Sequence, residues 1–189
     1  MALIPLFLLA LASRGGGGRG NDDFTPLPPD HGYICFGEGT LIWLERGWVP
    51  VEEIQTGDRI VTSRGIQTIL TVESWQPVEY RDRPAVFENV RLSPNHGIKV
   101  GNIIVPACNL TTVRSRIDGS RYFHILVEDH SWLFAKADAD GTIIRAESLC
   151  MTADLKLAKT FPDLVARHAS DPVAQIRVDP KDPTARRAA

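Results

Sequence analysis

Short turns interrupt the middle of this 189-residue chain so often that long helices have no room there. Between residues 33 and 149, dipeptides typical of tight turns separate short apolar runs: Arg46-Gly47, Gly57-Asp58, Arg64-Gly65, Gly101-Asn102, Asp118-Gly119 and Asp140-Gly141. Apolar and polar residues alternate from Ile66 to Glu73 and again near Ile98 and Ile103, a period typical of strands. The sequence therefore predicts an all-β body of about ten short strands.

The two ends of the chain differ from this body. Residues 1–12 are almost entirely apolar, but a helix needs roughly 20 such residues to cross a bilayer. The glycine run 15–18 and a Pro- and Asp-rich stretch predict a flexible linker. After Met151, apolar spacing predicts one or two short helices, the second beginning at Pro162, and then a polar tail. We therefore divide the chain into three parts. Residues 1–34 are an apolar segment with its linker, residues 35–150 are a β domain, and residues 151–189 are a helical region with its tail.

The N-terminal run leaves the location of the protein open. Ala10-Leu11-Ala12 resembles a signal-peptide cleavage site, but the first basic residue, Arg14, follows the apolar stretch instead of preceding it. Export or membrane attachment through residues 1–12 and a cytoplasmic location are therefore both retained as expectations.

Composition excludes several classes of protein. With 21 Lys+Arg against 23 Asp+Glu the net charge is -2, so we expect no nucleic-acid partner. The three cysteines, Cys35, Cys108 and Cys150, are far apart and form no Cys-x-x-Cys pair, which argues against a zinc ribbon or a disulfide framework. A metal site built from Cys35, Cys108, His96 and His124 has no supporting ligand spacing, and no cofactor is expected.

The most specific motif opens the β body. It consists of Cys35-Phe36-Gly37-Glu38-Gly39-Thr40-Leu41-Ile42, then Gly47, Val51-Glu52-Glu53-Ile54, Gly57-Asp58-Arg59-Ile60-Val61-Thr62 and Gly65. In order and spacing, these residues resemble the start of a Hint domain, the self-processing module shared by hedgehog proteins and inteins. The tetrad Ser93-Pro94-Asn95-His96 lies where that family has its Thr-x-x-His element. Residues 122–135 resemble the penultimate block of the family, which consists of a strand, a Val-Glu-x-His turn and a second strand. The bacterial hedgehog/intein-like branch looks closest, and the resemblance implies a compact, horseshoe-like β fold.

The position of Cys35 suggests a reaction on the chain itself. Its sulfur can reach the carbonyl carbon of the Ile34-Cys35 bond through a five-membered ring, so the attack is intramolecular. The resemblance implies that an N-to-S acyl shift forms a thioester at Cys35 and that the bond is then cleaved, once per molecule rather than with multiple turnover. A thiol with a pKa of about 8.5 is only about 3% ionised at pH 7, so a base is needed, and His96 is the first candidate.

The resemblance also implies roles for three further residues. His96 would give a proton to the departing amide nitrogen, and Ser93, in place of the usual threonine, would polarise the scissile carbonyl or orient the amide. His124 occupies a position where many inteins have aspartate and would relay protons to Cys35 or activate the acceptor; the alternative is a structural strand histidine. We expect His130 to stabilise its turn and His168 to be a surface residue.

Splicing is not expected. Splicing inteins end in His-Asn, whose asparagine cyclises, whereas Arg145 and Ala146 fall at that position here and neither can cyclise. Only residues 97–121 separate the Ser93-His96 element from the next block, too few for an inserted endonuclease. The N-terminal segment would thus be the domain's own substrate, and an unidentified nucleophile, water or a small molecule, its acceptor.

Two alternatives stay open. The first is a binding or structural module that keeps the fold but no longer reacts, because the β-branched Ile34 crowds the reacting carbonyl and Ser93 replaces threonine. The second is a conventional Cys-His hydrolase acting on other proteins, which is weaker because the nucleophile stands at the first strand of its domain. For a self-cleaving domain, the cut would separate the body from residues 1–12.

Overall fold

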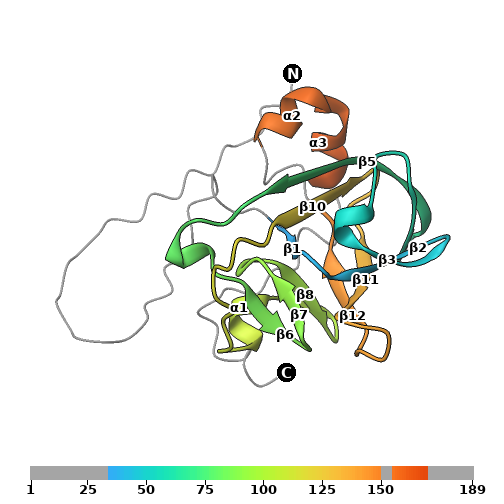
Figure 1. The fold of residues 1–189 in the computed structure, drawn as a ribbon. Coiled ribbons are helices and arrows are strands. Elements are labelled where there is room, and N and C mark those ends of the chain that lie inside the picture. The colour runs from blue at the N-terminus through green and yellow to red at the C-terminus, as the bar shows by residue number, and fades with distance from the viewer. Residues whose placement is uncertain (1–33, 150–154, 170–189) are drawn as a thin grey trace.

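The fold is built from twelve antiparallel strands. The computed structural model describes residues 34–149 and 155–169, and Figure 1 shows their arrangement. The strands are β1 (Phe36–Gly37), β2 (Leu41–Leu44), β3 (Gly47–Pro50), β4 (Arg59–Thr62), β5 (Gly65–Trp75), β6 (Ala85–Phe87), β7 (Val90–Leu92), β8 (Gly97–Val100), β9 (Ile103–Pro106), β10 (Tyr122–Val127), β11 (Trp132–Lys136) and β12 (Ile144–Glu147). The predicted all-β class is confirmed. The additional strands are short ones such as β1 and β6, in which alternation over two or three residues gives no signal.

One long strand joins two halves of the sheet. Residues 65–68 of β5 pair with β4, and residues 69–75 pair with β10. The strands follow the order β6-β7-β1-β10-β5-β4-β2-β11-β12-β8-β9, with β3 attached to β2. Because β1 lies between β7 and β10, the residue that precedes it is placed in the interior of the fold rather than at an edge.

The main core consists of buried aliphatic and aromatic side chains from both halves of the sheet. Examples from five strands are fully or almost fully buried: Phe36, Ile42, Ile60, Leu92 and Leu133. Each such side chain contributes about 1.5–3 kcal/mol when it leaves water, so a core of this size stabilises the body without a disulfide or metal.

The alternation of apolar and polar residues in β5 favours burial of the face that contains Ile66, but the opposite face is the buried one. Ile66 is 44% exposed, whereas Gln67 and Ile69 are buried. The Gln67 amide donates to Thr62 Oγ1 at 3.1 Å and to Ser131 Oγ at 2.7 Å. These bonds compensate the burial of the glutamine, so a polar residue occupies a core position.

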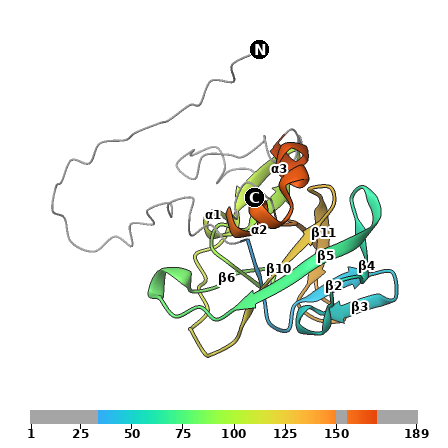
Figure 2. The ribbon, with the colours of Figure 1, turned by 90° about the horizontal axis from the view of Figure 1, so that it is seen from above.

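Two short helices cover one side of the sheet, as predicted. They are α2 (Leu155–Thr160) and α3 (Pro162–Ala169), and α1 (Ala107–Leu110) is a single turn after β9. Ala158, Phe161, Leu164 and Val165 pack on a second apolar cluster around the buried residues Leu126 and Leu149. Figures 1 and 2 both show α2 and α3 next to β5 and β10.

Several expectations concern other parts of the chain. The apolar run 1–12, the linker, Cys150 and the polar tail lie outside the described residues. In the described parts, no helix has the length and apolarity required to cross a membrane.

Candidate active site

Ser93, His96 and His124, the predicted partners of Cys35, all contact that residue. Cys35 directly precedes β1, Ser93 follows β7, His96 precedes β8 and His124 lies in β10. All four are buried, and Ile34 is only 3% exposed. The pairing of β1 with both β7 and β10 therefore brings together residues up to 89 positions apart in the sequence.

Ser93 contacts both sides of Cys35. The amide N–H of Cys35, which belongs to the Ile34-Cys35 peptide bond, donates to Ser93 Oγ at 2.9 Å. The carbonyl oxygen of Cys35 accepts from the Ser93 N–H, also at 2.9 Å. Of the two roles expected for Ser93, orienting the amide is the one that these contacts match.

His96 contacts the carbonyl oxygen of Cys35 and not its thiol. Its Nδ1 lies 2.8 Å from Cys35 O, and its Nε2 lies 3.0 Å from the carbonyl oxygen of Glu147. A neutral imidazole has one N–H, so only the imidazolium can donate to both oxygens. The ring of Phe36 packs edge-on against it at 4.5 Å. The structure thus differs from the expectation that His96 is the base beside the thiol.

His124 and Trp75 are the polar side chains at the sulfur. His124 Nδ1 lies 3.8 Å from Cys35 Sγ, and the Trp75 indole N–H donates to the same sulfur at 3.3 Å. On the other side of the ring, His124 Nε2 lies 3.3 Å from Glu73 Oε2. A carboxylate at Nε2 favours the tautomer with its proton there, which leaves the Nδ1 lone pair facing the thiol.

The register between β5 and β10 aligns this group. Glu73 stands directly opposite His124, and Trp75 stands opposite Tyr122. Residues two apart on a strand share a face, and directly opposite residues lie about 5 Å apart, so the four side chains form one cluster. Sequence reasoning missed Glu73 and Trp75. Alternation places them on one face of β5, but only the pairing with β10 places that face against Cys35.

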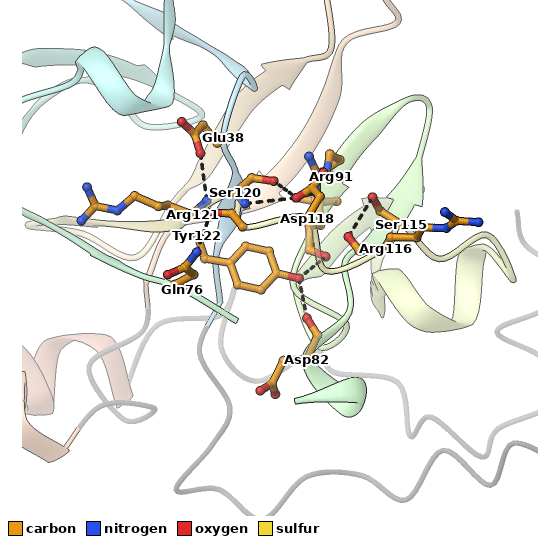
Figure 3. Close-up of polar contacts among 12 residues, drawn as sticks. Glu38, Gln76, Asp82, Arg91, Ser115, Arg116, Asp118, Ser120, Arg121 and Tyr122 are labelled. Atoms are coloured by element: carbon orange, nitrogen blue, oxygen red, sulfur yellow. Dashed lines mark hydrogen bonds and ion pairs between the residues drawn. The ribbon is translucent and has the colours of Figure 1, made fainter. Parts of the chain in front are cut away.

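The start of β10 is fixed by one half-buried and one exposed polar contact, which Figure 3 shows. The Tyr122 hydroxyl donates to the carbonyl oxygen of Asp82 at 2.9 Å, and Glu38 Oε2 accepts from the Arg121 N–H at 2.9 Å. Burial raises the pKa of Tyr122 above its usual range, so the phenol remains a donor. These bonds tie β10 to its surroundings two residues before His124.

Two further histidines are buried, and one of them contradicts its prediction. His168 was predicted at the surface, but its ring is fully buried and its Nε2 lies 3.0 Å from the carbonyl oxygen of Glu128. It stacks on His130, with 5.8 Å between the ring centroids. His130 is itself fully buried, and its Nε2 lies 3.4 Å from Glu147 Oε2. The expected role of His130 in stabilising its turn stays a prediction.

The two residues at the expected position of His-Asn lie on opposite faces of β12. Arg145 is exposed, with its guanidinium 5.8 Å from the ring centre of Phe134. Ala146 is buried and pairs with Leu133 and Ile98. Across residues 34–149 and 155–169, no cluster of three or more His, Cys, Asp or Glu side chains could hold a metal ion.

Cys108 provides a test of site selectivity. It is half-buried rather than part of the core, and burial raises the pKa of its thiol to about 11. At pH 8 only roughly 0.1% of this thiol is ionised, and that fraction rises about tenfold per pH unit up to pH 11. We expect native Cys108 to react with iodoacetamide over 100-fold more slowly at pH 8 than in urea, as measured by peptide mass mapping. Equal rates in the two conditions would contradict the effect of burial.

Comparison with known proteins identifies the family of this chain. The Hint domain family matches residues 34–153, which are 120 of the 189 residues. The solution structure of a bacterial intein-like domain from Clostridium thermocellum has 15% sequence identity and a TM-score of 0.46, and the match covers 59% of this chain and 97% of that domain. The crystal structure of the gp41-1 intein has 13% identity and a TM-score of 0.32, with 60% and 98% covered. No curated protein matches the chain. The chain therefore belongs to the Hint domain family of self-processing modules.

Proposed function

We propose that this protein cleaves its own Ile34-Cys35 peptide bond through a thioester at Cys35, without splicing. The main support is the set of contacts on that bond: Ser93 at the amide nitrogen and His124 at the thiol. The alternative of a hydrolase acting on other proteins gains no support from this arrangement, because Cys35 is fully buried.

The first step is activation of the thiol. His124 keeps its Nε2–H on Glu73 and accepts the thiol proton at Nδ1. The separation of 3.8 Å is long for proton transfer, but such contacts shorten in the reactive geometry. The Trp75 indole N–H donates a hydrogen bond to Cys35 Sγ, and this bond stabilises the thiolate because hydrogen bonds to ionised acceptors are stronger. Glu73 acts through His124 and is a positioning residue.

The second step exchanges the amide for a thioester. Cys35 Sγ bonds to the carbonyl carbon of Ile34, and the bond from that carbon to the Cys35 nitrogen breaks. The nitrogen becomes a free amine and takes up one proton, which balances the one proton that the sulfur lost. Ser93 Oγ, 2.9 Å from this nitrogen, is the group that can pass the proton on. His96 holds the adjacent carbonyl oxygen and so fixes the orientation of the leaving amine.

The last step is cleavage of the thioester by water or a small nucleophile. The acceptor gives its proton to His124, its oxygen, nitrogen or sulfur bonds to the Ile34 carbonyl carbon, and the Cys35 thiolate leaves and is reprotonated. The process occurs once per molecule. Arg145 and Ala146 provide no cyclising side chain, so no second junction is cut.

Intact-mass analysis of freshly purified full-length protein tests the proposal. At pH 7–8 we expect two products, residues 1–34 and 35–189, formed faster with a small thiol. In the presence of thiol the first product should have the added mass of a thioester adduct. A contaminating protease would give a free carboxylate at residue 34 instead, and heat-denatured protein serves as the control. A chain that stays full length in every condition would contradict the proposal.

That negative outcome is what an inert Hint-fold module predicts. One observation favours this second candidate: Ile34 is β-branched and 3% exposed, so its carbonyl is crowded. Replacing Ile34 by glycine in the same assay separates the two candidates further, because a crowded but competent site gains rate and an inert one does not.

A further inference from the structure

Helix α3 lies beyond residue 153, where the family match ends, yet it contributes a buried ring to the interior. His168 is fully buried, whereas its neighbours Ala166 and Arg167 are exposed. The ring stacks on His130 and its Nε2 lies 3.0 Å from Glu128 O. A polar side chain is normally buried only where it has hydrogen-bond or packing partners, so the burial of His168 is a specific feature of this fold.

Contacts lead from this ring to the backbone carbonyl of Cys35. His130, under His168, faces Glu147 Oε2 at 3.4 Å, and the two side chains are fully buried. The carbonyl oxygen of Glu147 lies 3.0 Å from His96 Nε2, and His96 Nδ1 lies 2.8 Å from Cys35 O. Within the described residues, neither ring nitrogen of His130 has a hydrogen-bond partner of normal geometry. The position of His130 therefore depends on its packing against His168.

The backbone makes room for Glu147. The Gly97 N–H donates to Glu147 Oε1 at 2.9 Å, and a Cβ on Gly97 would lie 2.4 Å from that oxygen. A buried carboxylate is costly unless it is paired and hydrogen-bonded. The amide of Gly97 provides a hydrogen bond, and the ring of His130 lies 3.4 Å from the other carboxylate oxygen, next to the residue that contacts the Cys35 carbonyl.

The docked helices also cover the strand of the other site histidine. Leu164 and Val165 pack on the cluster containing Leu126, two residues after His124 in β10. The Leu149 N–H, at the end of β12, donates to the carbonyl oxygen of Ile125 at 2.9 Å. The helices therefore cover the place where the strands bearing His124 and Glu147 are joined.

We infer that α3 is part of the processing site and that His168 is a positioning residue, which acts through His130 and Glu147 on His96. The inference rests on the self-cleavage proposed above. It assigns a function to a segment outside the family match, and it predicts that changes in this helix affect a reaction at a residue much earlier in the sequence.

The test uses full-length variants at a temperature well below the melting point of each. His168→Ala removes the ring, and His168→Phe keeps a ring that can pack while removing the hydrogen bond to Glu128. Ala166→Gln, at an exposed position of the same helix, is the matched control. We expect His168→Ala to slow cleavage at least tenfold, His168→Phe to retain more rate than His168→Ala, and Ala166→Gln to stay within twofold of the wild-type rate.

A second readout is independent of cleavage. In the non-cleaving Cys35→Ala background, ¹⁵N spectra of the histidine rings should show that His168→Ala shifts the His96 resonances and that Ala166→Gln does not. If the wild-type protein fails to cleave, the proposed function fails, and these spectra still decide the coupling. Unchanged His96 resonances in His168→Ala would overturn the inference, with or without a slower rate, and so would a wild-type rate.

Discussion

Replacement of Cys35 by alanine is expected to abolish self-cleavage, leaving a full-length chain by intact mass at pH 7–8 with or without thiol. The reason is that the sulfur is the only group proposed to bond to the Ile34 carbonyl carbon, and the remaining contacts of Ser93 and His96 do not form a covalent intermediate. Uncatalysed hydrolysis of an amide is too slow to appear in this assay.

Two control variants sharpen this result. Cys108→Ala should cleave at the wild-type rate, because Cys108 lies outside the site and burial holds its thiol pKa near 11. Cys35→Ser should be much slower than the wild-type protein, since a hydroxyl is far less acidic than a thiol. A fragment that begins at residue 35 in the alanine variant would show that another group cuts the bond.

Replacement of His124 by alanine is expected to lower the cleavage rate by roughly 100- to 10,000-fold, the usual contribution of a general base. The wild-type rate should fall as the pH drops through the range in which imidazole becomes protonated, since the base must be neutral to accept the thiol proton. The variant should lose this limb of the profile. Single-turnover rates from pH 5 to 9 provide the measurement, with circular dichroism to verify folding.

Glu73→Gln separates general base catalysis from packing. The side-chain amide of the introduced glutamine would donate to His124 Nε2 and so favour the tautomer with its proton on Nδ1, facing the sulfur. In that tautomer Nδ1 cannot accept the thiol proton. We expect a rate between those of the wild-type protein and His124→Ala, while Glu53→Gln, an exposed position, stays at the wild-type rate. A normal rate in His124→Ala together with an inactive His96→Ala would instead return the role of the base to His96.

The sequence predicted the local elements well because their signals are local. The turn dipeptides bound β2 to β5 and β8 to β12, and Pro162 begins α3, where its missing N–H has no cost. Cys35, Ser93, His96 and His124 were found through motifs of fixed order. The contacts of the other three with Cys35 depend on the position of β1 between β7 and β10, which the order of the motifs does not give.

What could not be predicted depends on long-range register and docking. Glu73 looks like an ordinary polar strand residue until β5 pairs with β10 and sets it opposite His124. His124, and not His96, lies at the thiol, and the sequence could not predict this because a few ångströms decide which ring faces the sulfur. His168 lies in an eight-residue helix with several exposed neighbours, and only the docking of that helix buries it.

The central position of β1 has a consequence for the direction of the reaction. Phe36, the residue after the nucleophile, pairs with Phe123 on one side and Leu92 on the other, so the backbone beside Cys35 stays anchored when the peptide bond opens. The leaving amine cannot diffuse away, because it belongs to the same residue as the thioester sulfur. In the proposed reaction, amide and thioester would therefore interconvert within one folded molecule. The concentration of the acceptor, and not loss of the leaving group, would then commit the chain to irreversible separation.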